Sequence, residues 1–221
     1  GVRVDTGVFE GGEVSMYYDP MIAKLVTYGE DRLCAIKKMQ QALDDYYIQG
    51  VQHNISFLNA LMVHPRFLEG RLTTNFIAEE YPDGFDSSHV PQDDPAQAIV
   101  VTACVHRSHT DRASRLSGQM VGYERKHSEA WVVTIDDISH EVNVWPIEDG
   151  YRVEFEGKAY KVVTDWDIRE PLLNCTINGV YASFQVERVG IWYHLTHRGA
   201  QTKAVVMTPR AAELHAKMPE K

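Results

Sequence analysis

The sequence predicts an α+β chain in two parts, of which the second is an eight-stranded antiparallel β-barrel around a long central helix. Apolar residues recur at helical spacing before Pro82, whereas short alternating runs follow Trp131. A polar, turn-rich stretch separates these regions, and a nearly all-apolar segment begins after Asp94. We therefore predict a first domain over residues 1–82, a linker over 83–94 and a helix-in-barrel domain over 95–221.

The first part is expected to contain strands followed by helices. Val2 and Val4 alternate as in a strand, and the apolar run Met21–Thr27 indicates a buried strand. Apolar spacing, caps and prolines predict three helices, from Asp31 to about Tyr47, from Asn54 to before Pro65, and from about Thr74 to Tyr81.

The second part opens with a strong helix start, Asp94-Pro95-Ala96-Gln97. An acidic N-cap, a proline at the first helical position and a glutamine three residues after the cap predict a helix from Pro95 to about Arg112. Its first half is apolar nearly all round, so it must be enclosed on all sides. β-branched residues would also permit a strand, but the cap and the length favour a helix.

Eight short alternating runs follow, which would close into an up-and-down barrel filled by the helix. Asn178-Gly179 is the strongest turn, since a type I′ hairpin needs two positive φ angles. After this turn, Val180, Ala182, Phe184 and Val186 are expected on a dry face, and Tyr181, Ser183, Gln185 and Glu187 on a wet one. A final helix is capped by Thr208-Pro209. The runs are Trp131–Ile135, His140–Trp145, Tyr151–Phe155, Ala159–Thr164, Leu172–Ile177, Val180–Arg188, Ile191–His197 and Thr202–Met207.

The composition of the chain argues against several classes of protein. With 44% hydrophobic and 24% charged residues, the 221-residue chain is typical of a soluble globular protein. Its formal charge of -9 argues against nucleic-acid binding. The longest apolar run, Ala98–Val105, is far shorter than the roughly 20 residues of a membrane span. The three cysteines lie far apart without a C-x-x-C spacing, which favours a reducing compartment over a disulfide framework or zinc site.

The sequence lacks the common short motifs for nucleotide binding and for nucleophilic catalysis. It contains no phosphate-binding G-x-x-x-x-G-K-[ST], no G-x-G-x-x-G and no G-x-S-x-G. His106 and His109 lie three apart on the predicted helix without a third ligand nearby, so no metal site is expected. Lys217 in "AKM" lacks the Met-Lys-Met core of a biotin-attachment sequence and is interpreted as a solvated lysine.

Two stretches resemble the C-terminal part of the biotin carboxylase domain of biotin-dependent carboxylases. They read "GVRVDTGVFEGGEVSMYYDPMIAKLVTYGEDR" (residues 1–32) and "MQQALDDYYIQGVQHNISFL" (residues 39–58). The remainder is similar to α subunits of propionyl-CoA carboxylases, through "YPDGF" at 81–85, "PLLNCTINGV" at 171–180 and "TPRAAELHAKM" at 208–218. In that family this region is the BT domain, a long helix inside an eight-stranded barrel, preceded by a biotin carboxylase domain of ATP-grasp type.

The resemblance implies a function for the whole subunit. Such subunits use ATP, bicarbonate and Mg²⁺ (or Mn²⁺) to carboxylate biotin, which then carries the carboxyl group to a carboxyltransferase β subunit. The family's catalytic, ATP-binding and metal-binding residues correspond to sequence upstream of Gly1, and its biotinyl domain to sequence downstream of Lys221. We therefore expect no catalytic, cofactor-binding or metal-binding residue in this segment, and no biotin-dependent ATP hydrolysis by it alone. The implied compartment is the bacterial cytoplasm or the mitochondrial matrix.

The resemblance also implies partners and candidate site residues. The partners are the β subunit, the biotinyl domain of the same chain and other α subunits, without nucleic acid or membrane. Asp19 in "YYDPMIAKL" either supports a biotin-contacting arginine or only turns the chain. The segment "DRASRLSGQMVGYERKH" (residues 111–127) is either a disordered loop or the hook that grips the β subunit. Its predicted contact residues are Arg115, Leu116, Met120, Val121 and Tyr123.

Two alternatives stay open. One is a free-standing barrel that binds a small ligand, against which a helix inside the barrel argues because it leaves little cavity. The other is the α subunit of a methylcrotonyl-, geranyl- or long-chain acyl-CoA carboxylase. Acyl-CoA choice is not readable in this sequence, since the family's acyl-CoA site lies on the β subunit.

Overall fold

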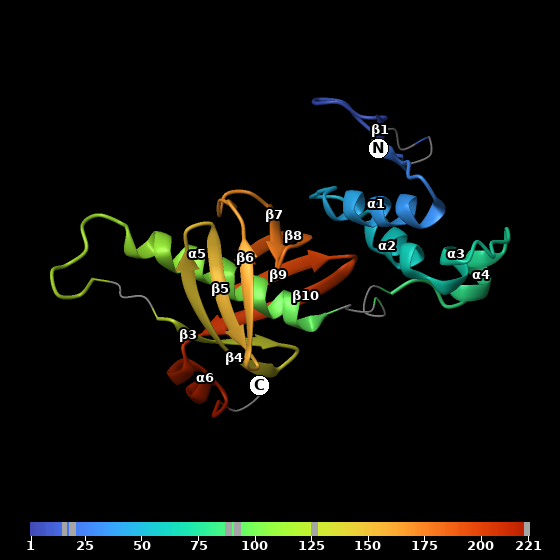
Figure 1. The fold of residues 1–221 in the computed structure, drawn as a ribbon. Coiled ribbons are helices and arrows are strands. Elements are labelled where there is room, and N and C mark those ends of the chain that lie inside the picture. Colours follow the sequence, from blue (N-terminus) through green and yellow to red (C-terminus); the bar gives the residue numbers. More distant parts are fainter. Residues whose placement is uncertain (15–16, 18–20, 87–89, 91–93, 125–127, 219–221) are drawn as a thin grey trace. The chain divides into compact units, whose positions relative to one another are not determined.

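The computed structural model describes all residues except 15–16, 18–20, 87–89, 91–93, 125–127 and 219–221 (Figure 1). The chain divides into two compact units, Gly1–Val90 and Pro91–Lys221. The domain bounds 1–82, 83–94 and 95–221 stay a prediction. Asp19 lies outside the described residues.

The first unit contains a two-stranded antiparallel sheet followed by short helices. Strand β1 pairs with β2 in the register Val2↔Thr27. The strand predicted from Met21 begins at Ala23, and the third helix is shorter than predicted. The elements are β1 (Val2–Thr6), β2 (Ala23–Thr27), α1 (Arg32–Asp44), α2 (Ile55–Val63), α3 (Pro65–Leu68) and α4 (Phe76–Glu80).

Helix α3 was not predicted, and its first residue explains why. Pro65 was interpreted only as the end of the preceding helix, but a proline is also favourable at the first position of a new one. Arg66 on this helix pairs with Glu79, at 2.8 Å, and with Glu80. The hydrogen bond from Arg66 lowers the pKa of Glu80, and the two ion pairs together fasten α3 to α4.

The second unit is a closed antiparallel barrel of eight strands, in the order β10-β3-β4-β5-β6-β7-β8-β9 (Figure 1). Each strand pairs with its neighbour in sequence, and β10 closes the barrel on β3. The predicted up-and-down barrel is therefore confirmed. The strands are β3 (Ala130–Ile135), β4 (Ile138–Ile147), β5 (Gly150–Phe155), β6 (Lys158–Val163), β7 (Leu172–Ile177), β8 (Val180–Val189), β9 (Trp192–His197) and β10 (Ala200–Met207).

Helix α5 (Pro95–Ser114) lies inside the barrel, as predicted (Figure 1). The Asp94 carboxylate caps it by accepting a hydrogen bond from the Ala96 amide at 3.0 Å. The buried Thr102 hydroxyl bonds to the Ala98 carbonyl at 2.7 Å, so this polar group is satisfied within the helix. A short helix α6 (Pro209–His215) follows the barrel. The core consists of inward-facing strand residues and the helix residues Ile99, Val100, Val101, Ala103, Cys104 and Val105.

The β7–β8 hairpin confirms the predicted turn, since Asn178 and Gly179 have φ angles of 50° and 83°. The predicted faces of β8 were wrong at two positions. Val180 is exposed because it directly follows the turn at the barrel end. Ser183 is buried because its hydroxyl donates to the Asn174 side chain on β7, at 2.9 Å, and its carbonyl contacts the His197 ring on β9, at 2.8 Å.

Gly150 is the first residue of β5, and it allows close approach of the next strand. Its φ is 148°, and a Cβ atom placed on it would lie 2.1 Å from the Val162 carbonyl oxygen.

Among the described residues, no helix combines the length and the apolar character needed to cross a lipid bilayer.

Candidate functional site: the segment after the barrel helix

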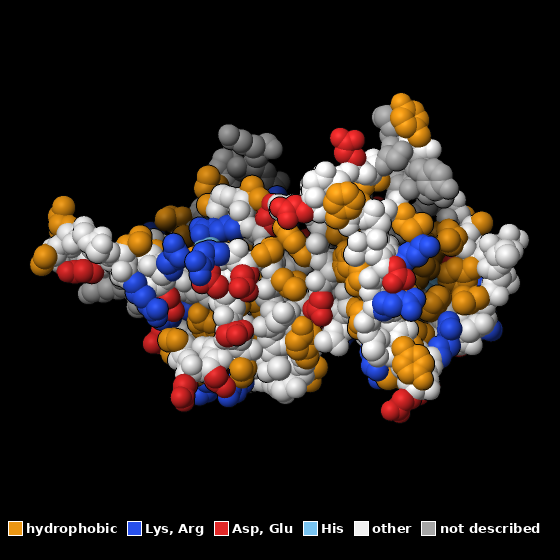
Figure 2. Space-filling view, turned by 90° about the horizontal axis from the view of Figure 1, so that it is seen from above, with side chains coloured by type: hydrophobic (Ala, Val, Ile, Leu, Met, Phe, Trp, Pro, Cys, Tyr) orange, Lys and Arg blue, Asp and Glu red, His pale blue; other side chains and the backbone are white. Residues whose placement is uncertain are grey.

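Residues 115–124, here called the tip segment, leave the end of α5 and project from the barrel (Figure 1). Three of its apolar side chains are strongly exposed: Met120 at 71%, Val121 at 89% and Tyr123 at 82%. Figure 2 shows hydrophobic side chains at the outer end of this projection. Exposed apolar groups gathered on one segment make it a candidate surface for binding another molecule.

A β-turn shapes the outer end of the tip segment. The Tyr123 amide donates to the Met120 carbonyl at 3.0 Å, and Gly122 between them has a φ of 84°. A type II turn requires such a positive φ at its third residue, which glycine adopts without steric cost. The Gly122 amide also donates to the Glu124 carboxylate at 3.0 Å, which lowers the pKa of Glu124. The turn therefore holds Val121 outward at its corner.

Side-chain hydrogen bonds fasten the start of the tip segment to α5. The Gln119 amide group donates to the carbonyls of Ser114, at 2.7 Å, and Leu116, at 3.0 Å. The Arg115 amide donates to the Arg112 carbonyl at 3.1 Å. The last carbonyls of a helix have no partner within the helix, so these bonds satisfy groups that would otherwise need water. The segment thus leaves the helix in a defined direction.

Arg107, on α5, closes the base of the projection. The residue is only 5% exposed, and its Nε donates to the Asp111 carboxylate at 2.7 Å. Its Nη1 donates to the carbonyls of Ser128, at 3.1 Å, and Val144, at 3.2 Å. Ser128 belongs to the chain that returns to β3, and Val144 belongs to β4. One guanidinium therefore joins the helix to the returning chain and to the barrel wall.

The structure places all the predicted contact residues on the tip segment, exposed to solvent. Their role in contacting a β subunit stays a prediction. Sequence reasoning missed Gln119, Gly122 and Arg107, which shape the segment. The available signals were a glycine inside a polar stretch and an Arg-Asp pair four residues apart on a predicted helix. The predicted contact residues are Arg115, Leu116, Met120, Val121 and Tyr123.

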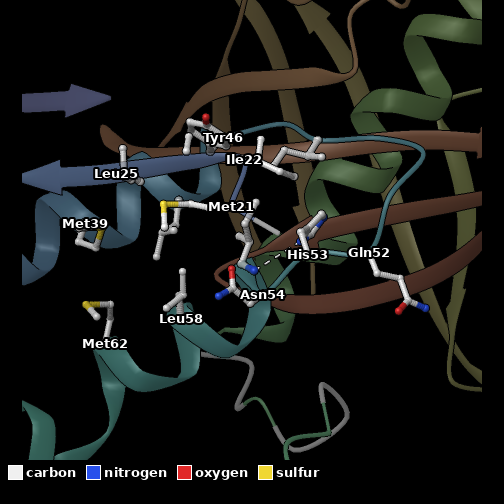
Figure 3. Close-up of a pocket in the computed structure, with 14 residues that line it drawn as sticks. Met21, Ile22, Leu25, Met39, Tyr46, Gln52, His53, Asn54, Leu58 and Met62 are labelled. Atoms are coloured by element: carbon white, nitrogen blue, oxygen red, sulfur yellow. Dashed lines mark hydrogen bonds between the residues drawn. The ribbon is translucent and has the colours of Figure 1, made fainter. Parts of the chain in front are cut away.

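A second candidate is a cavity of about 580 Å³ in the first unit (Figure 3). Its walls come from β2, α1, α2 and the adjoining loops, and they are mostly apolar, with Leu25, Met39 and Met62 among them. Gln52, His53 and Asn54 are among its polar lining residues, and the His53 ring accepts a 3.4 Å hydrogen bond from the Ile55 amide. Lys and Arg do not occur among the described lining residues, so the cavity offers no cation to a phosphate.

The histidines near the end of α5 are part of the packing. His106 Nδ1 lies 3.0 Å from the Tyr193 hydroxyl, and the His106 ring packs edge-on against Trp131. Burial, followed by the nearby Arg188 and Arg112, lowers the pKa of His109. Within the described part of the chain, no group of three or more His, Cys, Asp or Glu side chains is placed to hold a metal ion.

Comparison with known proteins assigns both units. Residues 1–79 match the family model described as biotin carboxylase C-terminal domain. Residues 99–221 match the one described as propionyl-coenzyme A carboxylase BT domain.

Three relatives show how far the likeness extends. The chain is 43% identical over 221 residues to the propionyl-CoA carboxylase alpha chain of Ruegeria pomeroyi, covering 100% of this chain and 32% of the relative. It is 34% identical over 226 residues to the mitochondrial propionyl-CoA carboxylase alpha chain of Mus musculus, covering 100% and 31%. For the mitochondrial methylcrotonoyl-CoA carboxylase subunit alpha of Dictyostelium discoideum, the identity is 41% over 114 residues, covering 52% and 16%. The chain thus spans about a third of the length of the first two relatives.

Proposed function

Because the chain belongs to the propionyl-coenzyme A carboxylase BT domain family and carries a biotin carboxylase C-terminal domain before it, we propose that it is part of the α chain of a propionyl-CoA carboxylase. The observation that carries this proposal is the 43% identity to one such α chain over the full 221 residues. The whole protein would use ATP and bicarbonate to carboxylate biotin, and propionyl-CoA would be converted to methylmalonyl-CoA. The present chain would complete the biotin carboxylase domain and dock the carboxyltransferase β subunit.

The cofactors of this reaction are biotin, ATP and Mg²⁺ or Mn²⁺. The described residues do not fit the metal ion or the ATP phosphates, since they hold no cluster of three or more potential metal ligands and the cavity of the first unit has no Lys or Arg among its described lining residues. We assign no chemical step to these residues. That this segment alone has no biotin-dependent ATPase activity stays a prediction.

For the compartment, the bacterial cytoplasm or the mitochondrial matrix stays proposed, and the mouse relative is named as mitochondrial.

The tip segment supports the docking role through its chemistry. Aromatic residues, methionine and arginine are enriched in the cores of protein interfaces, and Met120, Tyr123 and Arg115 supply one of each. The turn at Gly122 and the hydrogen bonds of Gln119 form in the unbound chain, so binding need not order this part of the backbone. These features suit the segment to the β subunit. The biotinyl domain and other α subunits stay further proposed partners.

The alternatives have weaker support. A barrel that binds a small ligand inside would need an open interior, whereas α5 fills it with buried side chains such as Val100, Val101 and Val105. A methylcrotonyl-CoA carboxylase is the second candidate, because its Dictyostelium relative matches, although over 52% of this chain only. Geranyl-CoA and long-chain acyl-CoA carboxylases stay as less supported alternatives.

A charge-insertion experiment tests the docking role. The full-length α chain with Met120→Glu and Tyr123→Glu should lose co-elution with the β subunit on size exclusion, with affinity lowered at least about tenfold, because two desolvated contacts are replaced by charges. The matched control replaces Ile138 and Val180, which are exposed apolar residues at hairpin ends on the opposite end of the barrel, with Glu. Undiminished co-elution of the Met120/Tyr123 variant would contradict the assignment.

The substrate is tested on the assembled enzyme. Carboxylation of propionyl-, methylcrotonyl-, geranyl- and long-chain acyl-CoA should be compared by incorporation of labelled bicarbonate. We expect the largest kcat/KM for propionyl-CoA. A preference for methylcrotonyl-CoA would instead establish the second candidate.

A further inference from the structure

We propose that Arg107 is a positioning residue that holds the tip segment in the orientation needed to bind the partner subunit. This inference rests on the proposed docking function and deepens it. Arg107 does not lie on the tip segment, is 5% exposed and would not itself touch a partner. Its influence would pass through the two places at which the projecting chain meets the barrel.

The Arg107 guanidinium joins three parts of the chain at the base of the projection. Nε bonds to Asp111, one helical turn further along α5, and Nη1 bonds to two main-chain carbonyls. Asp111 precedes the departure of the tip segment, whereas Ser128 follows its return. The Val144 amide donates to the Glu129 carbonyl at 2.8 Å, so β4 also binds the returning chain at this point. The two stems of the projection are thereby fixed to each other and to the barrel.

The shape of the arginine side chain suits it to this position. A planar guanidinium presents donors in several fixed directions, whereas a lysine ammonium is a compact charge on a flexible stem. Asp111 supplies the counter-charge, with its side chain 13% exposed. A buried ion pair contributes mainly geometric definition, because desolvation offsets much of its attraction. The three bonds of Arg107 therefore define how the stems cross rather than adding much net stability.

The base of the projection influences the direction in which the tip segment points. The hydrogen bonds described for residues 115–124 stay within the segment or reach the last turn of α5. They shape the turn at Gly122 and the start of the segment, whereas the bonds of Arg107 tie the base below it to the returning chain and to the barrel wall. A base tied by Arg107 would present Met120, Val121 and Tyr123 in one direction. A loosened base would spread them over many orientations, which a partner must then order at a cost in affinity.

The test uses the full-length α chain and its carboxyltransferase β subunit. Arg107→Gln removes the charge and the fork, and Arg107→Lys keeps the charge without the fork. Arg152→Gln removes an exposed, ion-paired arginine of strand β5 as the control. Hydrogen exchange of residues 115–124 is measured in the unbound α chain, and the dissociation constant for the β subunit by calorimetry. Tryptophan fluorescence checks that the barrel stays folded.

We expect Arg107→Gln to speed exchange in residues 115–124 and to weaken β-subunit binding by about tenfold, because the tip must be ordered on binding. Arg107→Lys should fall between this variant and the wild type, and Arg152→Gln should match the wild type. A folded Arg107→Gln chain with wild-type exchange and affinity would overturn the inference. If that variant does not fold, the same two measurements on Arg107→Lys decide.

The outcome is separable from that of the docking proposal. If the wild-type chain does not bind the β subunit, the docking proposal fails, and with it the role of Arg107 in partner binding. If the Met120/Tyr123 variant loses binding while both Arg107 variants keep it, docking stands and only the positioning role is overturned.

Discussion

Replacement of Gly150 by alanine should weaken the barrel more than other glycine-to-alanine changes. The added Cβ would lie 2.1 Å from the Val162 carbonyl oxygen and 3.1 Å from the Thr164 amide nitrogen. Carbon and carbonyl oxygen normally stay about 3.3 Å apart or more, so the two strands must separate by about 1 Å. Gly150 pairs with Val163 at this end of β5 and β6, and the neighbouring Val162 side chain is fully buried in the core.

The cost follows from these contacts. Separation would break or weaken one or two ladder hydrogen bonds, each contributing about 1 kcal/mol, and would disturb the packing of Val162. The φ of 148° adds backbone strain of about 1–2 kcal/mol for a residue with a Cβ. We therefore expect Gly150→Ala to lower the free energy of unfolding by about 2–4 kcal/mol.

Equilibrium urea unfolding followed by tryptophan fluorescence measures this loss. All four tryptophans lie in the barrel unit, so the signal reports that unit alone. Gly157→Ala is the matched control, because Gly157 lies in the turn joining the same strands, has a φ of 73°, and would carry a Cβ with no other atom within 4 Å. It should cost only about 1 kcal/mol, for the positive φ. An equal loss in the two variants would refute the steric argument. The four residues are Trp131, Trp145, Trp166 and Trp192.

Three further predictions concern ionisable groups. Burial raises the pKa of Cys175 to about 12 and that of Cys104 well above its ordinary value, so iodoacetamide at pH 8 should modify Cys34 alone until urea unfolds the barrel. The stabilising effect of these two protonated thiols is fully present below the thiol pKa of the unfolded chain, about 8.5, and is lost as the pH rises toward the pKa values of the folded chain. The urea midpoint should therefore fall between pH 8 and pH 10. A rise in the midpoint over this range would contradict the prediction. The Arg169 side chain and amide hold the pKa of Asp167 at about 2, so this ion pair contributes above the ordinary pKa of about 3.9 and is lost as the pH falls toward 2. An NMR titration of the Asp167 carboxyl group should show that midpoint, and Arg169→Gln should raise it; an unchanged midpoint would exclude Arg169 as the cause.

Elements specified by nearby residues could be predicted from the sequence. The start of α5 depends on Asp94 and Pro95, and the β7–β8 hairpin depends on Asn178 and Gly179, all of which act within a few residues. Strand alternation then predicted the barrel, because eight successive amphipathic strands have few other ways to bury one face. Local chemistry and the hydrophobic pattern agree for these elements.

Features that depend on distant residues could not be predicted in this way. Ser183 is buried by Asn174 and His197, which belong to neighbouring strands. Arg107 acquires its position through carbonyls 21 and 37 residues away in the chain. For the candidate site, the exposed apolar residues of the tip segment could be recognised because they follow no secondary-structure period. The turn at Gly122 and the Arg107–Asp111 pair are local features that sequence reasoning missed, whereas the bonds of Arg107 to Ser128 and Val144 depend on residues distant in the chain.

Helix α5 also sets a fixed distance in this domain. Its 20 residues span about 30 Å at 1.5 Å per residue, from Pro95 at one end of the barrel to Ser114 beneath the tip segment. One inserted residue would turn everything beyond it by about 100° around the helix axis and would bring the wrong side chains to the barrel wall. The barrel core can therefore tolerate changes in chain length in the tip segment but not in the helix. The length of α5 sets the distance between Pro95, where the chain enters the barrel, and the tip segment.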